Sequence, residues 1–321
     1  MKNRLSLIIK ILITIAVFMF LFIRFDIRFN DIIRSISNLY LLLLAIIVRL
    51  FINPLIYINR WKLFLKHSGI HESFFSLWKM SFISSFLGVI LPSSQGGDVV
   101  RMVMIEKKHK GFTQHKTASS SVIIERMIGF VLFSLIGLIS SLFTPDYPQK
   151  EKVIITILSI NIALWFILFF ITNRRCYLFF STILKKIKYI RKATEFIDKT
   201  HYSLVAFPYK KVLLSSVLLI FLLQISSILI VYLVFLSLDI NLPFYQHLSL
   251  YPIISILSLI PITISGLGLR EGFFVYFYSF IGVFPEVAVS ASLINYFIEV
   301  IIVALLGGIL YLLKMLNFLK I

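Results

Sequence analysis

The sequence predicts an all-α fold, a polytopic bundle of membrane helices, on three observations. Hydrophobic residues make up 59% of the 321 residues, and the mean hydropathy is +0.97, which leaves too little polar surface to coat a water-soluble globule. Several apolar segments reach the roughly 20 residues that a helix needs to cross a hydrocarbon layer about 30 Å thick. Two further apolar stretches are interrupted by Pro and Gly. We therefore expect about six spanning helices and two re-entrant hairpins in one domain over residues 1–321.

Six apolar segments have the length and composition that suit a complete membrane crossing. The first segment carries Lys2, Arg4 and Lys10 ahead of its apolar run, as in a signal peptide, but no small-x-small cleavage site comes after it, so we expect it to be retained. In chain order the predicted spans are 5–23, 39–58, 117–142, 153–172, 212–236 and 287–313.

Loop charge predicts the orientation of these spans. A net charge of +18 would suggest nucleic acid for a soluble protein, but here the basic residues lie between apolar segments, where they set topology, so we expect no nucleic-acid partner. With the amino terminus inside, 23 of the 32 Lys and Arg residues, Arg60 among them, fall in inside segments. We therefore expect a multi-pass protein of the cell inner (plasma) membrane with both termini cytoplasmic.

The one sizeable loop, 173–211, alternates apolar residues with lysines and arginines. Such a segment suits an amphipathic helix on the inner leaflet in contact with anionic lipid. It could equally serve only to enforce the topology.

The two interrupted stretches each begin and end on one side of the predicted topology. Residues 74–116 start and finish inside, whereas residues 248–286 start and finish outside, as in an inverted-topology repeat. The segments LPSSQGGDVVR and IPITISGLGLR support this pairing, because three residues of each match at a constant offset of 169 residues. The matched pairs are Pro92 with Pro261, Gly97 with Gly266, and Arg101 with Arg270.

Each hairpin break has the chemistry of an anion site. A Pro and Gly interruption frees backbone N–H groups and starts a short helix whose positive end faces the break. Arg101 and Arg270 follow a few residues later and supply planar donor forks suited to phosphate. The alternative is that each arginine only pairs with a carboxylate that holds its hairpin. The hairpin backbone would be formed by Pro92, Gly96, Gly97, Pro261, Gly266 and Gly268.

Acidic residues complete the candidate site, since carboxylates are costly in lipid and should face protein or water. They are Asp98 in the first hairpin, Glu125 beside Arg126, Glu271 in the second hairpin and Glu299 inside the last span. They could bind a cationic headgroup, carry protons or neutralise the arginines. Arg49 and Lys79 are interpreted as snorkelling or helix-pairing charges.

Metal and cofactor chemistry has no support in the sequence. Cys176 is the single cysteine, which excludes an internal disulfide and a cysteine-based metal cluster. The six histidines form no closely spaced pair on a predicted helix face. We expect no cofactor and no metal.

Three motifs, FLGVILPSSQGGDVVR, ASSSVIIERM and IPITISGLGLREG, occur in order. With them the chain resembles the lysylphosphatidylglycerol synthase transmembrane-region family, also called flippase-like or uncharacterised protein family 0104, over nearly its whole length. The resemblance implies membrane helices with two re-entrant hairpins, equivalent to the flippase half of the multiple peptide resistance factor. It also implies a polar core of Asp98, Arg101, Glu125, Arg126, Arg270 and Glu271. Two departures from the family pattern are Gly129, where an acidic residue often stands, and Gly88–Val89 in place of an Asn.

The expected function is therefore translocation of a membrane phospholipid or a polyprenyl-phosphate glycolipid by alternating access, without enzyme activity. The last predicted span ends near the end of the sequence, so we expect no synthase domain. One rival is a membrane-embedded lipid-modifying enzyme, which would need a nucleophile such as Ser93 or Ser94 with a base beside it. The other is a non-transporting scaffold of an envelope-assembly complex.

Overall fold

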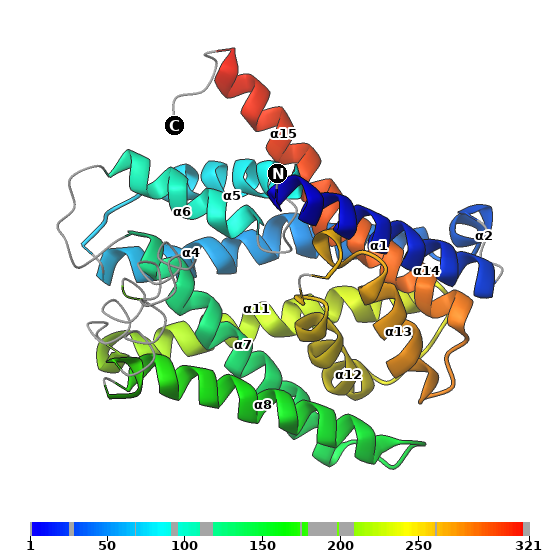
Figure 1. Cartoon of the computed structure of the whole chain (residues 1–321). Helices are drawn as coiled ribbons and strands as arrows, with labels where there is room; N and C mark the ends of the chain where they lie inside the picture. The colour runs from blue at the N-terminus through cyan, green and yellow to red at the C-terminus, as the bar shows by residue number, and fades with distance from the viewer. Residues whose placement is uncertain are drawn as a thin grey trace.

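A computed structural model describes residues 2–25, 29–67, 69–90, 96–109, 118–173, 175–178, 198, 209–260 and 262–316 (Figure 1). The described part consists of helices without strands, which confirms the all-α prediction. Five helices are long and apolar enough to cross a membrane, and they overlap five of the predicted spans. The helix over the remaining predicted span is α1 (Lys2–Arg24). The total number of spans stays a prediction. The five long apolar helices are Leu39–Lys66, Glu125–Phe143, Lys150–Phe170, Ser215–Ser237 and Pro285–Met315.

Most helices belong to two series with one order: a long helix, two short helices and a second long helix. The first series is α3 (Leu39–Ile47), η1 (Val48–Ile52), α4 (Asn53–His67), α5 (Phe74–Ile90), α6 (Gly96–Lys108) and α7 (Ala118–Phe143). The second is α11 (Tyr209–Ser237), α12 (Phe244–Leu257), η3 (Ile264–Gly266), α13 (Leu269–Ser279), α14 (Pro285–Tyr296), η4 (Phe297–Ile301) and α15 (Ile302–Met315). Outside both lie α1, α2 (Phe29–Arg34) and α8 (Lys150–Thr172).

The predicted repeat extends well beyond the two hairpins. Adding 169 to the helix bounds of the first series brings each bound within four residues of its counterpart in the second. The long helices α3–η1–α4 and α14–η4–α15 each run through a π-helical turn, at η1 and η4. Such turns are local bulges that often mark functional sites.

Packing between the two series is reciprocal. The first hairpin contributes α5 to a close contact with α15, while the second contributes α12 to a contact with α7. The α5–α15 approach brings backbones together, because a Cβ on Gly307 would overlap the carbonyl oxygen of Phe82. In the α7–α12 contact, a Cβ on Gly137 would lie 3.0 Å from Pro252 Cβ. Each hairpin therefore packs on the last long helix of the other series.

The two hairpins enter the bundle from opposite ends, and the inner ends of their helices α5, α6, α12 and α13 lie near its middle (Figure 1). In the first hairpin, α5 and α6 pack so closely that a Cβ on Gly88 would overlap the backbone of Gly97. In the second, α12 packs on α13 across the turn at η3. This is the inverted arrangement that the loop charges predict.

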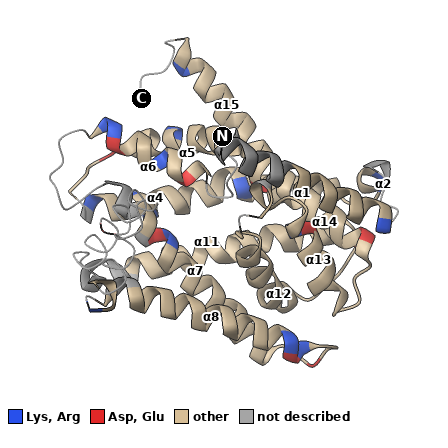
Figure 2. Ribbon diagram, in the orientation of Figure 1, with Lys and Arg blue, Asp and Glu red and all other residues tan. Residues whose placement is uncertain are grey.

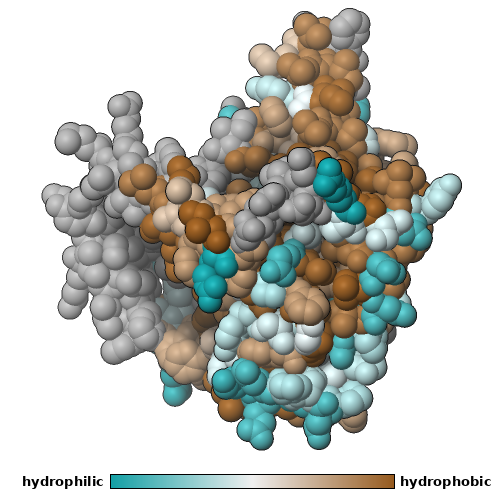
Figure 3. All heavy atoms as spheres, turned by 90° about the vertical axis from the view of Figure 1, so that its right-hand side faces the viewer, coloured by the Kyte–Doolittle hydropathy of each residue, from teal (hydrophilic) through white to brown (hydrophobic). Residues whose placement is uncertain are grey.

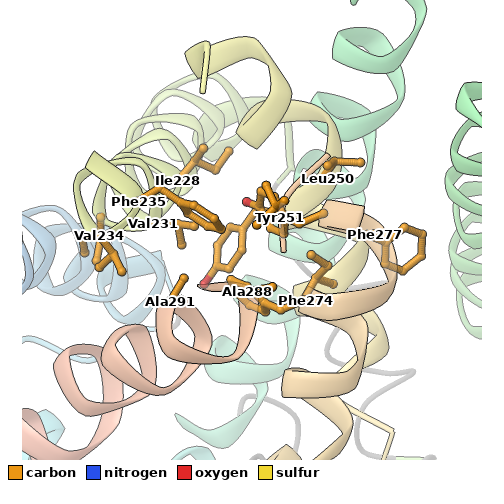
Figure 4. Close-up of a cluster of buried hydrophobic side chains, with 14 of the residues drawn as sticks. Ile228, Val231, Val234, Phe235, Leu250, Tyr251, Phe274, Phe277, Ala288 and Ala291 are labelled. Carbon is orange, nitrogen blue, oxygen red and sulfur yellow. The ribbon is translucent and has the colours of Figure 1, made fainter. Parts of the chain in front are cut away.

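A buried apolar cluster holds the second series together (Figure 4). All four of its helices contribute, and the aromatic rings of Phe235 and Tyr278 lie 4.5 Å apart between centroids. The cluster fixes α12 and α13 relative to α11, which positions the second hairpin tip. Labelled members are Ile228, Val231, Val234, Phe235, Leu250, Tyr251, Phe274, Phe277, Ala288 and Ala291.

The helix ends segregate as the charge count predicts. The ends of α4, α6 and α8 lie at one end of the bundle, and the α7–α8 and α13–α14 connections lie at the other (Figure 1). Charged residues mark both ends and a few interior positions (Figure 2). Figure 3 looks onto the end that is predicted to lie outside and shows hydrophilic residues there beside hydrophobic ones. Which end faces the cytoplasm stays a prediction, and most of the basic loop 173–211 lies outside the described residues.

Candidate functional site

A cavity of about 440 Å³ lies between the two hairpin tips. Gly88 and Gly97 line it from the first hairpin, and Ser258 and Ser265 line it from the second. The long helices of both series form its walls. The cavity thus occupies the place where the sequence predicts two facing half-helix sites.

Five charged side chains form an arginine–carboxylate network at the first hairpin, with charges that alternate along it. Arg60 pairs with Glu125, whose other oxygen lies 3.6 Å from Arg101 Nη1. Arg101 Nη2 lies 3.2 Å from Asp98 Oδ1, and Arg126 Nε lies 2.6 Å from Asp98 Oδ2. Three cations therefore share two anions, so the network carries one excess positive charge. In order of contact its members are Arg60, Glu125, Arg101, Asp98 and Arg126.

The two ends of this network differ in exposure, which decides where the excess charge is available. The Arg60 side chain is 4% exposed and the Arg126 side chain is 41% exposed, although both residues line the cavity. Arg101, in the middle, is 1% exposed, donates to the Tyr57 hydroxyl and lies 4.6 Å from the ring centroid of Trp61. Arg126 contacts Asp98 through Nε and through Nη2, which donates to Asp98 Oδ1 at 3.0 Å. It is nevertheless the more exposed cationic end of the network, and the network presents this end to the cavity.

At the second hairpin the charges balance within one group. Arg270 Nη2 lies 2.6 Å from Glu271 Oε1, its Nε donates to Ser292 Oγ at 3.1 Å, and its guanidinium stacks on Tyr296. The other oxygen of Glu271 accepts the Gly268 backbone N–H at 2.6 Å. Glu271 thereby caps the start of α13, so its own carboxylate occupies the helix end that was predicted to bind an anion.

A third ion pair joins the two π-helical turns. Arg49 in η1 lies with its Nε 2.9 Å from Glu299 Oε2, and its Nη2 also donates to the Glu299 backbone carbonyl at 2.9 Å. This confirms helix pairing as the role of Arg49. Both residues line the cavity.

The structure brings the predicted site residues together around one space, in two layers. Asp98, Glu125, Arg126, Arg270 and Glu299 line the cavity. Arg101 and Glu271 lie behind them, 1% and 0% exposed, so in this conformation each positions a neighbour instead of facing a ligand.

The hairpin backbone residues are placed in part. Gly96 and Gly97 begin α6 and line the cavity, while Gly266 and Gly268 adopt left-handed backbone conformations with φ of 75° and 83°. Pro92 and Pro261 lie outside the described residues, as do Ser93 and Ser94.

Arg60 was misplaced by the charge count, which assigns it to an inside loop. The helix continues past the predicted end of the second span, through α4, and buries Arg60 at 3% exposure against Glu125. Tyr57 and Trp61, which lie one turn apart on α4 and both contact Arg101, also belong to the site and were missed. A signal for them was the absence of Gly and Pro between the predicted span end and His67.

The two departures from the family pattern have different structural roles. Gly88 permits the backbone contact that closes the first hairpin, as any side chain there would overlap Gly97. Gly129 lines the cavity, and its carbonyl accepts a hydrogen bond from Gln224 Nε2 at 3.2 Å. The departure at Gly88 therefore affects the shape of the first hairpin, and the departure at Gly129 affects the wall of the cavity.

The fold and the site define a multi-pass, all-helical membrane protein with two hairpins around a charged cavity. Residues 7–307 match the family described as the lysylphosphatidylglycerol synthase TM region, and the chain belongs to this family. It is similar to a UPF0104 membrane protein of Pyrococcus horikoshii, with 26% identity over 86% of this chain and 88% of the relative. UPF0104 membrane proteins of Methanothermobacter thermautotrophicus and Methanocaldococcus jannaschii are 21% and 24% identical, over 87% and 96% of this chain and 86% and 94% of theirs.

Proposed function

We propose that this protein is a lipid translocase of the plasma membrane that binds a phosphate-bearing headgroup in the cavity between its hairpins. The observation that carries the proposal is the unbalanced network at the first hairpin, which offers Arg126 to the cavity with one excess positive charge. A guanidinium is the side chain best suited to a phosphate, because its planar donors bind two oxygens together.

The second hairpin supplies the opposite wall of the proposed binding site. Arg270 donates hydrogen bonds from Nη2 to Glu271 and from Nε to Ser292, and it also lines the cavity. A headgroup held by Arg126 could pass toward Arg270 while its tails stay in lipid, as in alternating access between inverted repeats.

Transport accounts for the site better than catalysis does. Asp98, Glu125 and Glu299, the carboxylates that line the cavity, are each ion-paired with an arginine. A general base needs a carboxylate that is free to take a proton. The proposed partners are therefore a phospholipid or polyprenyl-phosphate lipid in the cavity and anionic lipid of the inner leaflet along the basic loops.

The test is movement of a fluorescent phosphatidylglycerol between the leaflets of proteoliposomes, read by chemical quenching of the outer leaflet. We expect the unaltered protein to accelerate exchange and Arg126→Ala to abolish the acceleration. Arg34→Ala is the matched control, because Arg34 is exposed, lies outside the basic loop 173–211 and does not line the cavity.

A parallel arm uses a fluorescent polyprenyl glycosyl phosphate in the same vesicles. Failure of the folded, unaltered protein to move either lipid would refute the translocase and favour a scaffold role.

A further inference from the structure

The parts of the cavity wall differ in net charge and in their hydrogen-bonding groups, and these differences bear on which lipid headgroup fits. Five arginines and four carboxylates line or back the cavity, so the surroundings carry one excess positive charge. Each of these carboxylates lies within ion-pair distance of an arginine. The network at the first hairpin holds the excess, while the pairs Arg49–Glu299 and Arg270–Glu271 are balanced.

The cavity also offers neutral hydrogen-bond acceptors. Asn53 Oδ1, Asn295 Oδ1 and Ser81 Oγ have no hydrogen-bond partner, although their residues are only 2%, 2% and 8% exposed. All three residues line the cavity. A buried polar atom without a partner is costly, so a ligand that donates hydrogen bonds to these atoms would be stabilised.

Serine hydroxyls on both tips add to the acceptors. Ser84 and Ser85 donate to the carbonyl of Ser81 at 2.8 and 3.0 Å, and Ser258 donates to the carbonyl of Ile254 at 2.6 Å. Each hydroxyl proton is thus used within its own helix, and the oxygen lone pairs stay available to a ligand. Donors on the ligand, not acceptors, match this wall.

We propose that the cavity selects headgroups with one phosphodiester charge and uncharged hydroxyl groups, and discriminates against headgroups that carry an ammonium group. This inference rests on the proposed translocase function. One phosphodiester charge neutralises the excess at Arg126, and the hydroxyls donate to Asn53, Asn295 and the serines. A glycerol or sugar headgroup has this chemistry, on a phospholipid or on a polyprenyl phosphate.

A headgroup that carries an ammonium group does not neutralise the excess positive charge of the site. A phosphoethanolamine group is neutral overall and leaves the excess positive charge in place, while an aminoacylated phosphatidylglycerol adds to it. An ammonium also needs a carboxylate without a competing cation, because buried charges must be paired. Glu299, which lies one helical turn from Asn295, is already paired with Arg49 and is therefore not available to an ammonium group.

The first test compares headgroups on the unaltered protein in proteoliposomes. Fluorescent phosphatidylglycerol and a fluorescent polyprenyl hexosyl phosphate are the hydroxylated probes, and fluorescent phosphatidylethanolamine and lysylphosphatidylglycerol are the ammonium probes. We expect at least one hydroxylated probe to move about tenfold faster than both ammonium probes, the difference that one charge-assisted hydrogen bond supports. Whichever hydroxylated probe moves faster identifies the lipid class.

Equal or faster movement of an ammonium probe would overturn the selectivity while leaving the translocase intact. Movement of no probe would overturn both.

The second test adds a negative charge to the cavity. Arg49→Gln releases Glu299, and Asn295→Asp places a carboxylate of nearly the same shape on the acceptor wall. We expect each variant to shift the rate ratio of phosphatidylethanolamine to phosphatidylglycerol about tenfold upward. Both rates are measured on the same protein preparation. A smaller fraction of folded protein therefore lowers both rates equally and leaves their ratio unchanged.

Two controls accompany these variants. Arg49→Gln with Glu299→Gln removes both charges and should return the ratio to that of the unaltered protein. Asn241→Asp adds the same charge at an exposed position outside the cavity and should leave the ratio unchanged. An unchanged ratio in both Arg49→Gln and Asn295→Asp would refute the headgroup selection.

Discussion

Glu125 and Arg126 are neighbours in the sequence, and the structure predicts opposite consequences for their substitution. Glu125→Gln removes a fully buried anion that lies between Arg60 and Arg101, and it leaves Arg60 buried without its ion-pair partner. Breaking a buried pair in this way costs about 3–5 kcal/mol of unfolding free energy. Arg126→Gln removes the partly exposed end of the network and leaves Asp98 paired with Arg101, which should cost about 1 kcal/mol or less.

The assay is reversible unfolding in mixed detergent micelles, combined with lipid exchange in proteoliposomes. Glu125→Gln should lose stability first and transport as a result, whereas Arg126→Gln should lose transport while its unfolding midpoint stays near that of the unaltered protein. The Arg34→Gln variant controls for loss of a surface charge. Equal destabilisation by the two neighbouring substitutions would refute the division of the network into a buried core and a ligand-facing end.

Three further predictions concern packing, pH and topology. Gly307→Ala should destabilise the protein by about 1–3 kcal/mol in the same unfolding assay, since its Cβ would overlap the Phe82 carbonyl, whereas Gly272→Ala, with open space at its Cβ, should not. Partial burial raises the pKa of the Glu72 carboxyl, but hydrogen bonds from Ser76, Lys108 and His109 outweigh it and hold the pKa below its ordinary value. The stabilisation by ionised Glu72 should therefore be full above about pH 4.5 and be lost as the pH falls further, and Glu72→Gln should remove this dependence. In a Cys176→Ser background, cysteines at Asp146 and Leu242 should react with an impermeant reagent on intact cells, and cysteines at Lys107 and Tyr189 only after permeabilisation; labelling of Lys107 on intact cells would reverse the orientation.

The architecture could be predicted from the sequence because hydropathy and loop charge are signals that are summed over many residues. Three matched residues at one offset predicted a paired hairpin, and the helix bounds extend this offset over the whole of both series. The length of an apolar segment does not depend on local irregularities of its helix, so five of the spans could be identified from the sequence. A π-helical turn such as η1 shifts the helical period by a single residue, which no composition average detects.

The partners of charged side chains were beyond the reach of the sequence. Arg101 and Arg270 occupy matched positions, yet the structure buries the first under Tyr57 and Trp61 and leaves the second at the cavity. Which arginine faces a ligand depends on contacts between helices far apart in the chain, here α4 with α7. Arg60 shows the same limit, because its burial follows from the position of Glu125 and not from its own neighbours in sequence.

The backbone contacts around α5 have a mechanical consequence. This helix touches α6 through Gly88 on one side and α15 through Gly307 on another, with no side chains between the backbones. Sliding or tilting of α5 alone would collide with both neighbours, so the three helices should travel as one rigid block. That block combines a hairpin from the first series with a long helix from the second, and the packing of α12 on α7 defines the equivalent block with the two series exchanged. In a rocking motion these two mixed blocks would then move relative to each other. The moving units would differ from the two series of helices that the duplicated sequence suggests.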